Sequence, residues 1–184
     1  MQEAVPLGVG GMAAIIGLSE EKLKECLVEA RKYGVVEISN YNTPKQLVIG
    51  GEAKAVEVAI ELCKEAGARR AVPLKVSGPF HTPLLEEASV NLAKELNNIE
   101  FQDMKIPVLT NVTAEVIADS SQIKDLLIKQ VKSSVKWTET IRNMIDMGID
   151  TFIEIGPSRT LSGFLRDIDR SVTTFNVEDM KSLN

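Results

Sequence analysis

One histidine stands out in this sequence, because it is the only one among 184 residues. His81 follows the apolar run 71–76, which is typical of a buried strand, and precedes a helical pattern that begins at Leu84. Pro79 and Pro83 restrict the backbone on either side, so the ring is expected in a rigid loop at a strand end. Imidazole can take up and return a proton near neutral pH, which makes His81 a candidate general base. A histidine that merely lines a loop is the alternative, and position alone does not separate the two.

A base of this kind needs a nucleophile, which hydrolases and acyltransferases usually carry on a Gly-x-Ser-x-Gly turn between a strand and a helix. The nearest match is Gly-Pro-Ser-Arg-Thr at 156–160, where Thr160 stands in place of the second glycine. Ser158 could act with His81 in an independent hydrolase, or it could simply occupy the first turn of a helix. The sequence has no Walker loop, no dinucleotide fingerprint and no Cys/His cluster with metal-ligand spacing, so neither a cofactor nor a metal is expected.

A cluster of amide side chains lies in and directly after a segment rich in turn-forming residues, 40–45. Its members are Asn40, Asn42 and Gln46. These amides could serve their own backbone turn, or they could hydrogen-bond an acyl or amide ligand in a cleft.

Composition narrows the function classes. A net charge of -5 argues against a nucleic-acid-binding face, and no apolar run is long enough to span a bilayer. Cys26 and Cys63 fall on apolar stripes of predicted helices, which indicates reduced core cysteines in a cytosolic protein, with a disulfide as the alternative.

Hydrophobic periodicity divides the chain into two patterns. Residues 12–77 read as strand, helix, strand, strand, helix, strand, which predicts a ferredoxin-like antiparallel sheet with two helices on one face. After the histidine loop, helices alternate with short apolar strands, which suggests part of a parallel α/β sheet. The later strands are expected at 107–110, 151–155 and 172–175. The later helices are expected around 85–96, 123–131, 137–145 and 161–168.

Several short motifs occur in a specific order along the chain. They are Met1-Gln2 with the strand at 12–15, the segment 40–46, Ser77-Gly78-Pro79-Phe80-His81, Asn111-Val112-Thr113, Gln130, Val135-Lys136-Trp137-Thr138 and Glu154-Ile155-Gly156-Pro157. In this order the motifs resemble the malonyl-coenzyme A:acyl-carrier-protein transacylases, the acyltransferases of bacterial fatty-acid synthesis.

The resemblance implies an α/β-hydrolase-like acyltransferase domain, residues 1–11 and 78–184, with a ferredoxin-like subdomain, residues 12–77, inserted in it. It also implies transfer of malonyl from malonyl-coenzyme A to the phosphopantetheine thiol of acyl carrier protein through an acyl-serine. His81 matches the catalytic histidine, and Gln130 matches the residue whose main-chain carbonyl orients it. Phe80 matches malonyl-selective members, and the amides Asn40, Asn42 and Gln46 are candidate substrate-binding groups.

The chain also departs from the family pattern. The family's Gly-His-Ser-x-Gly stretch, its malonate-binding arginine and its oxyanion loop lie upstream of the position that matches Met1. The α/β-hydrolase-like part is therefore expected to be incomplete, exposing apolar surface or pairing with a companion chain, and the polypeptide is expected to be inactive alone. The alternative is a non-catalytic remnant that binds carrier protein or another partner. A nucleic-acid-binding ferredoxin-like domain would need exposed aromatics and a basic face, which the strands before His81 lack.

Overall fold

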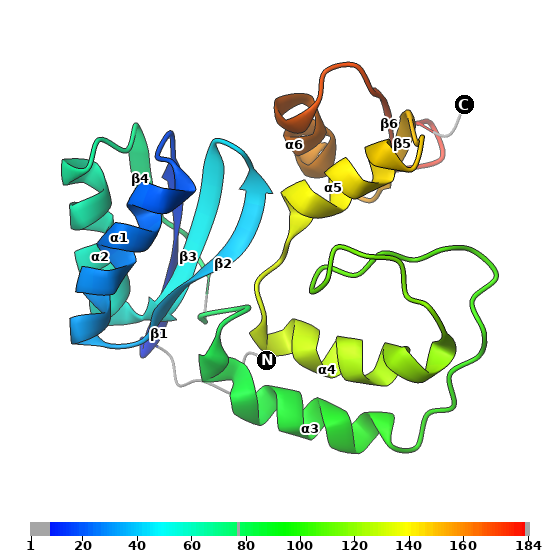
Figure 1. The fold of residues 1–184 in the computed structure, drawn as a ribbon, viewed down its shortest axis with the longest axis horizontal. Helices are drawn as coiled ribbons and strands as arrows, with labels where there is room; N and C mark the ends of the chain where they lie inside the picture. Colours follow the sequence, from blue (N-terminus) through cyan, green and yellow to red (C-terminus); the bar gives the residue numbers. More distant parts are fainter. Residues whose placement is uncertain (1–7, 77, 183–184) are drawn as a thin grey trace.

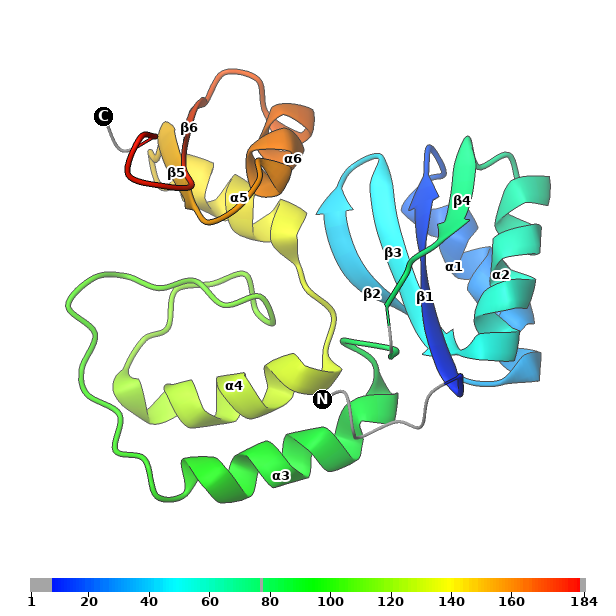
Figure 2. The same ribbon diagram turned by 180° about the vertical axis from the view of Figure 1, so that it is seen from behind.

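The computed structural model describes residues 8–76 and 78–182, so the motif residues Met1, Gln2 and Ser77 lie outside the described part. Three groups of elements are visible in Figures 1 and 2: a sheet backed by two helices, a pair of long helices, and a smaller α/β unit.

The first group is a four-stranded sheet in the order β2-β3-β1-β4, with every neighbouring pair antiparallel. Its strands are β1 (Gly10–Ile16), β2 (Val36–Thr43), β3 (Gln46–Glu52) and β4 (Arg70–Pro73). Its helices are α1 (Glu20–Ala30), extended by the 3-10 turn η1 (Arg31–Tyr33), and α2 (Ala53–Glu65). The expected order strand, helix, strand, strand, helix, strand is therefore confirmed.

Local chemistry explains where α1 begins and ends. Ser19 caps the helix by accepting a hydrogen bond from the backbone N–H of Lys22, and two glutamates in the first turn suit the positive end of the helix dipole. Gly34, at φ 138°, follows η1 and turns the chain into β2. The apolar stripes of α1 and α2 pack on the same sheet face and form the main core of the protein.

Both cysteines belong to this core and are free thiols, as expected. Burial, and then the neighbouring thiol of Cys26, raise the pKa of Cys63 to about 12. Because the thiolate is the reactive form, Cys63 is expected to be chemically inert.

The second group is an antiparallel pair of helices that lie side by side in both views. Its elements are the 3-10 turn η2 (Pro83–Leu85), α3 (Glu86–Leu96), the 3-10 turn η3 (Ser120–Gln122) and α4 (Ile123–Lys132). A small apolar cluster centred on Leu85 and Val131 holds the two helices together.

The third group contains α5 (Trp137–Asp146), β5 (Thr151–Ile155), α6 (Thr160–Ile168) and β6 (Thr173–Val177). The strands β5 and β6 pair in parallel, with Thr151 opposite Thr173, so the expected parallel pairing is confirmed. The predicted exposure of apolar surface is confirmed here too, because Ile155 is 83% exposed and Phe175 is 56% exposed. A parallel sheet is normally covered on both faces, so this two-stranded sheet exposes surface that such sheets usually bury.

The structure differs from the sequence-based expectation at three strands. The predicted turn 40–45 is mostly strand: β2 continues to Thr43, and only Pro44 and Lys45 turn the chain. The reason is pairing on both sides, since Tyr41 pairs with Leu47 of β3 and its N–H donates to the carbonyl of Val135 at 2.8 Å. The amides Asn40 and Asn42 therefore lie on a strand and not in a turn.

The strand expected over 71–76 is β4, which ends at Pro73. Beyond it, the N–H of Val76 donates to the carbonyl of Leu74 at 2.9 Å, which bends the chain away from the ladder. The strand expected at 107–110 is absent from the described residues, where Leu109 makes only an isolated bridge with Val116. A single bridge does not provide the repeated ladder bonds that define a strand.

No helix in the described part of the chain has both the length and the apolar character needed to cross a membrane.

Candidate functional site

The loop that carries His81 lies on the face of the four-stranded sheet opposite α1 and α2. On β3, Leu47 and Ile49 point into the helix-side core, so Gly50 faces the other side. A Cβ at Gly50 would lie 3.0 Å from Cγ2 of Thr82 and 3.5 Å from the carbonyl oxygen of Phe80. The loop thus packs directly on the sheet where a glycine leaves room for it.

Internal contacts hold this loop rigid. Thr82 is fully buried, and its hydroxyl donates to the carbonyl of Pro79 at 2.6 Å. His81 has φ 60°, a left-handed conformation that costs a non-glycine residue about 1–2 kcal/mol. Strained residues of this kind persist where the surrounding structure over-determines them, and they cluster at functional sites.

The His81 ring contacts the end of α4. Its Nδ1 lies 3.0 Å from the main-chain carbonyl oxygen of Gln130, which belongs to the last turn of the helix. Carbonyls in a last turn have no intrahelical partner and are free to accept. Because a carbonyl oxygen can only accept, Nδ1 carries the proton in the neutral ring and Nε2 keeps its lone pair. The tautomer of the half-buried ring is thus set by its neighbour.

Two of the other predicted site residues lie on the same sheet face. Asn40 pairs with Val48 across the sheet, and Gln46 alternates with Leu47, so both lie on the face that carries the histidine loop. The Asn40 side-chain oxygen accepts from the Ser39 hydroxyl at 2.9 Å. Within the described residues, the amides of Asn42 and Gln46 make no hydrogen bond, so neither serves its own backbone turn.

Phe80 packs against the Leu85–Val131 cluster between α3 and α4. Its ring therefore packs on the helix-pair side of the loop.

The segment that joins α4 to α5 runs along the free edge of β2. The N–H of Val135 donates to the carbonyl of Ser39 at 2.8 Å, and the Ser134 hydroxyl donates to the carbonyl of Ile38 at 2.6 Å. The Thr138 hydroxyl donates to the carbonyl of Tyr41 at 3.0 Å. The Val135–Thr138 motif thus attaches the second and third groups to the sheet.

The Glu154–Pro157 motif forms a tightly bonded turn before α6. The Glu154 carboxylate accepts from the N–H groups of Leu161 and Ser162, at 3.0 and 2.8 Å, and from the Ser162 hydroxyl at 2.7 Å. Burial opposes its charge, but these bonds hold the pKa of Glu154 below its ordinary value. Asn176 donates to the carbonyl of Ser158 at 2.7 Å, so residues far apart in sequence fix the turn. No sequence motif pointed to Asn176.

Ser158 sits in this turn with φ 74°, and its hydroxyl lies 3.0 Å from that of Thr160. No hydrogen bond joins Ser158 to His81 within the described residues. In Figures 1 and 2, α6 also lies well away from the α3–α4 pair that follows the histidine loop. The geometry offers no support for an independent Ser158–His81 hydrolase.

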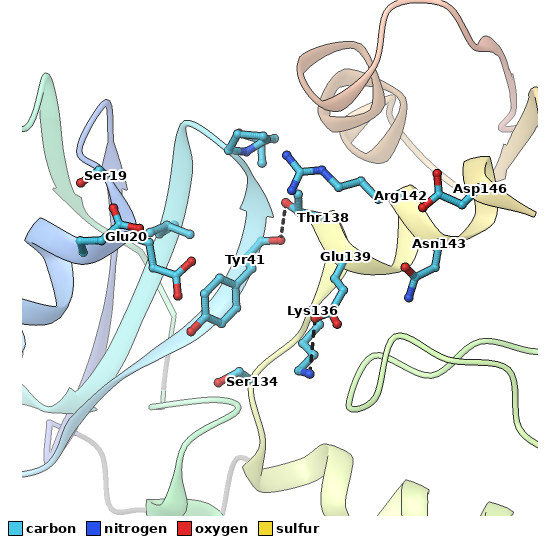
Figure 3. Close-up of a pocket in the computed structure, with 14 residues that line it drawn as sticks. Ser19, Glu20, Tyr41, Ser134, Lys136, Thr138, Glu139, Arg142, Asn143 and Asp146 are labelled. Atoms are coloured by element: carbon cyan, nitrogen blue, oxygen red, sulfur yellow. Dashed lines mark hydrogen bonds and ion pairs between the residues drawn. The ribbon is translucent and has the colours of Figure 1, made fainter.

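A groove of about 790 Å³ opens between the β2–β3 hairpin and α5, as Figure 3 shows, and no motif in the sequence pointed to it. Tyr41 lines this groove and packs on the helix-side core, so the groove is separate from the histidine loop. Burial, and then the nearby Glu20 carboxylate, raise the pKa of the Tyr41 phenol.

The groove carries charged side chains of both signs. Its basic side chains are Lys136 and Arg142, and Arg142 extends from α5 towards the β2–β3 hairpin. The acidic side chains outnumber them and are Glu20, Glu21, Glu139 and Asp146. Such a charge balance does not suit an anionic coenzyme.

Across the described residues, no group of three or more His, Cys, Asp or Glu side chains is placed to hold a metal ion.

The close fit of the histidine loop leads to a prediction at Gly10. A Cβ there would lie 2.5 Å from Cδ of Pro79, whereas a Cβ at the adjacent Gly11 would meet nothing within 4 Å. Gly10→Ala is expected to lower the Tm by roughly 3–10 °C, since overpacking costs about 1–3 kcal/mol. Gly11→Ala is the matched control and should change the Tm far less. Circular dichroism melts of both variants provide the measurement, and equal losses would show that the loop does not press on β1.

The chain is similar in sequence and in structure to known acyltransferases. A family described as "Acyl transferase domain" matches residues 1–183. A malonyl CoA-acyl carrier protein transacylase of Bacillus subtilis is 44% identical over 184 residues, which cover the whole chain and 58% of that protein. The crystal structure of an acyl carrier protein S-malonyltransferase from Vibrio cholerae superposes with a TM-score of 0.96 at 44% identity, over 100% of this chain and 60% of that one.

A malonyl-transacylase solved in complex with a type II polyketide acyl-carrier protein superposes with a TM-score of 0.95 at 40% identity, over 99% of this chain and 59% of that one. The described α/β architecture is therefore that of solved malonyltransferases. The chain spans less than two thirds of the length of these relatives.

Proposed function

This chain belongs to the acyl transferase domain family, and from that premise we propose that it supplies the general base for malonyl transfer from malonyl-coenzyme A to the phosphopantetheine thiol of an acyl carrier protein. One observation carries the proposal: Nδ1 of His81 lies 3.0 Å from the carbonyl oxygen of Gln130, which leaves Nε2 as the basic nitrogen.

The reaction has two halves that use the same ring. In the first, Nε2 of His81 takes the proton of a serine hydroxyl while the serine oxygen attacks the malonyl thioester carbonyl. The tetrahedral intermediate collapses, the C–S bond breaks, and the imidazolium returns the proton to the coenzyme A thiolate. In the second half, the ring takes the proton of the phosphopantetheine thiol, which attacks the acyl-serine, and then reprotonates the serine oxygen. The Gln130 carbonyl stabilises the imidazolium in both halves.

The remaining site residues are proposed to bind substrate. The amides of Asn42 and Gln46, which make no hydrogen bond within residues 8–76 and 78–182, suit together with Asn40 the amide groups of a pantetheine arm. Phe80 would border the malonyl group beside His81. Amino-acid side chains can carry out every proton transfer and nucleophilic attack in these steps, so the proposal requires no cofactor held by this chain. The phosphopantetheine is carried by the acyl carrier protein.

We assign residues 12–77 to a ferredoxin-like subdomain inserted in an α/β-hydrolase-like domain made from 1–11 and 78–184. The sheet order β2-β3-β1-β4 with two helices on one face supports the first part. The exposed apolar side chains of β5 and β6 support packing of the second part against further chain, such as a companion segment that carries the serine. A cytoplasmic location fits the two free buried thiols.

The proposal is tested by supplying the serine. The chain is mixed with the N-terminal segment of a related transacylase that contains Gly-His-Ser-x-Gly, and transfer of labelled malonyl to holo acyl carrier protein is followed. Transfer that requires both polypeptides is expected. Binding of the carrier protein with no transfer, despite association of the two segments, would favour the partner-binding remnant instead.

A further inference from the structure

The segment that follows the histidine loop makes several contacts with α4 besides the one at His81. The Ser89 hydroxyl donates to the carbonyl of Ile128 at 2.9 Å. The Glu86 carboxylate binds Nζ of Lys132 through both oxygens, at 2.7 and 2.6 Å. Together with the Leu85–Val131 cluster, these contacts attach the start of α3 to the last two turns of α4.

Ser89 is the unusual member of this set, because it is a polar residue that is only 1% exposed and lies at a largely apolar helix interface. Burying a hydroxyl is unfavourable unless it is hydrogen-bonded, so the bond to Ile128 is a specific requirement of the site. Ile128 lies two residues before Gln130 on the same helix. An α-helix advances about 1.5 Å per residue and is stiff over such a distance, so a contact at Ile128 also sets the axial position of the Gln130 carbonyl.

The His81 contact tolerates little sliding of α4. Nδ1 and the Gln130 oxygen are 3.0 Å apart, and such bonds weaken beyond about 3.2 Å. A shift of a few tenths of an ångström along the helix axis is enough to loosen the contact. The Glu86–Lys132 pair restrains the same shift from the helix end, although exposed pairs of this kind add little to overall stability.

We propose that Ser89 is a positioning residue for the base, assisted by the Glu86–Lys132 pair: it holds α4 in register so that the Gln130 carbonyl keeps the proton of the neutral ring on Nδ1 of His81. The consequence of this role for catalysis rests on the proposed function, whereas its effect on the tautomer of His81 does not.

The single histidine makes this directly measurable, because ¹⁵N-histidine labelling of the 184-residue chain gives signals from only one imidazole. At a pH where the ring is neutral, the two nitrogen shifts report the tautomer ratio. The wild-type chain is expected to show mainly the Nδ1–H form. Ser89→Ala should lower the ratio of Nδ1–H to Nε2–H by about fivefold, the factor that corresponds to one typical net hydrogen bond. Lys132→Met should lower the ratio in the same direction by a smaller factor.

Thr140→Val is the control, since Thr140 is also buried and its hydroxyl donates to a main-chain carbonyl, that of Lys136, at 2.9 Å in α5. It should leave the ratio unchanged. An unchanged ratio in folded Ser89→Ala would overturn the proposal. If Ser89→Ala fails to fold, the test rests on Lys132→Met, whose site is more exposed. An unchanged ratio of Nδ1–H to Nε2–H in that variant would also overturn the proposal.

A second measurement separates this inference from the proposed function. With the serine-bearing segment present, Ser89→Ala is expected to lower kcat by about tenfold and to leave KM unchanged, as a misplaced base would. If the wild-type pair transfers no malonyl while the tautomer still responds to Ser89→Ala, the proposed function fails and the positioning role stands. If malonyl transfer occurs but the tautomer ratio does not respond to Ser89→Ala, the proposed function stands and the positioning role fails.

Discussion

Incubated by itself with malonyl-coenzyme A, the 184-residue chain is expected to gain no mass. None of its residues forms a Gly-x-Ser-x-Gly stretch, and loss of the nucleophile in a serine–histidine unit typically costs about a millionfold in turnover. The nearest substitute, Ser158, is hydrogen-bonded to Thr160 and makes no hydrogen bond to His81 in the described part of the chain. Without a base to take its proton, this hydroxyl remains a weak nucleophile.

Intact-mass spectrometry of the incubated chain is the measurement. A related full-length transacylase, treated in the same way, serves as the positive control and should gain one malonyl group. A stoichiometric adduct on the short chain would contradict the expectation. Disappearance of that adduct in Ser158→Ala would then identify Ser158 as the nucleophile, and persistence would place the malonyl group elsewhere.

Replacement of the histidine is expected to have an effect of similar size. In the pair formed with a serine-bearing segment, His81→Ala should lower kcat by about a millionfold, because the residues of such a unit act together. Gln130→Ala should cost far less, since the contact to the ring uses the main-chain carbonyl, which this substitution leaves in place. The contrast between the two variants is specific to the proposed arrangement.

Single-turnover acylation by both variants provides the measurement, with circular dichroism melts to confirm that each is folded. If His81→Ala kept more than about a hundredth of wild-type acylation, the loss would be smaller than the roughly 10²–10⁴-fold that general base catalysis usually supplies, and the base would have to be sought elsewhere. A large loss in Gln130→Ala would instead point to a role for the amide side chain.

The expectation for His81 depends on packing from two sides of its loop. The lack of a side chain at Gly50 leaves room for the histidine loop on the sheet, and the end of α4 contacts the His81 ring from the other side. Substitutions that disturb either contact should therefore affect the His81 ring before they affect the main core, which is built separately from α1, α2 and the opposite sheet face.

Much of the fold follows from local patterns in the sequence. The apolar periodicity predicted the order strand, helix, strand, strand, helix, strand, which is observed, and Ser19 and Gly34 mark the two ends of α1 and its extension η1. Local patterns failed where a distant segment decides the conformation. Turn-forming residues at 40–45 suggested a loop, but pairing with Val135 keeps the chain extended through Thr43.

The sequence by itself determined which groups are available: one imidazole, a set of amides and no serine elbow. The resemblance to transacylases added the expectation that Gln130 serves His81. Only the tertiary structure decided that Ser89 reaches Ile128 and that a left-handed His81 turns its Nδ1 to a carbonyl 49 residues away. The physical reason is that side-chain type and period act over one or two turns. A hydrogen bond, in contrast, depends on tenths of an ångström that are set by how whole helices pack.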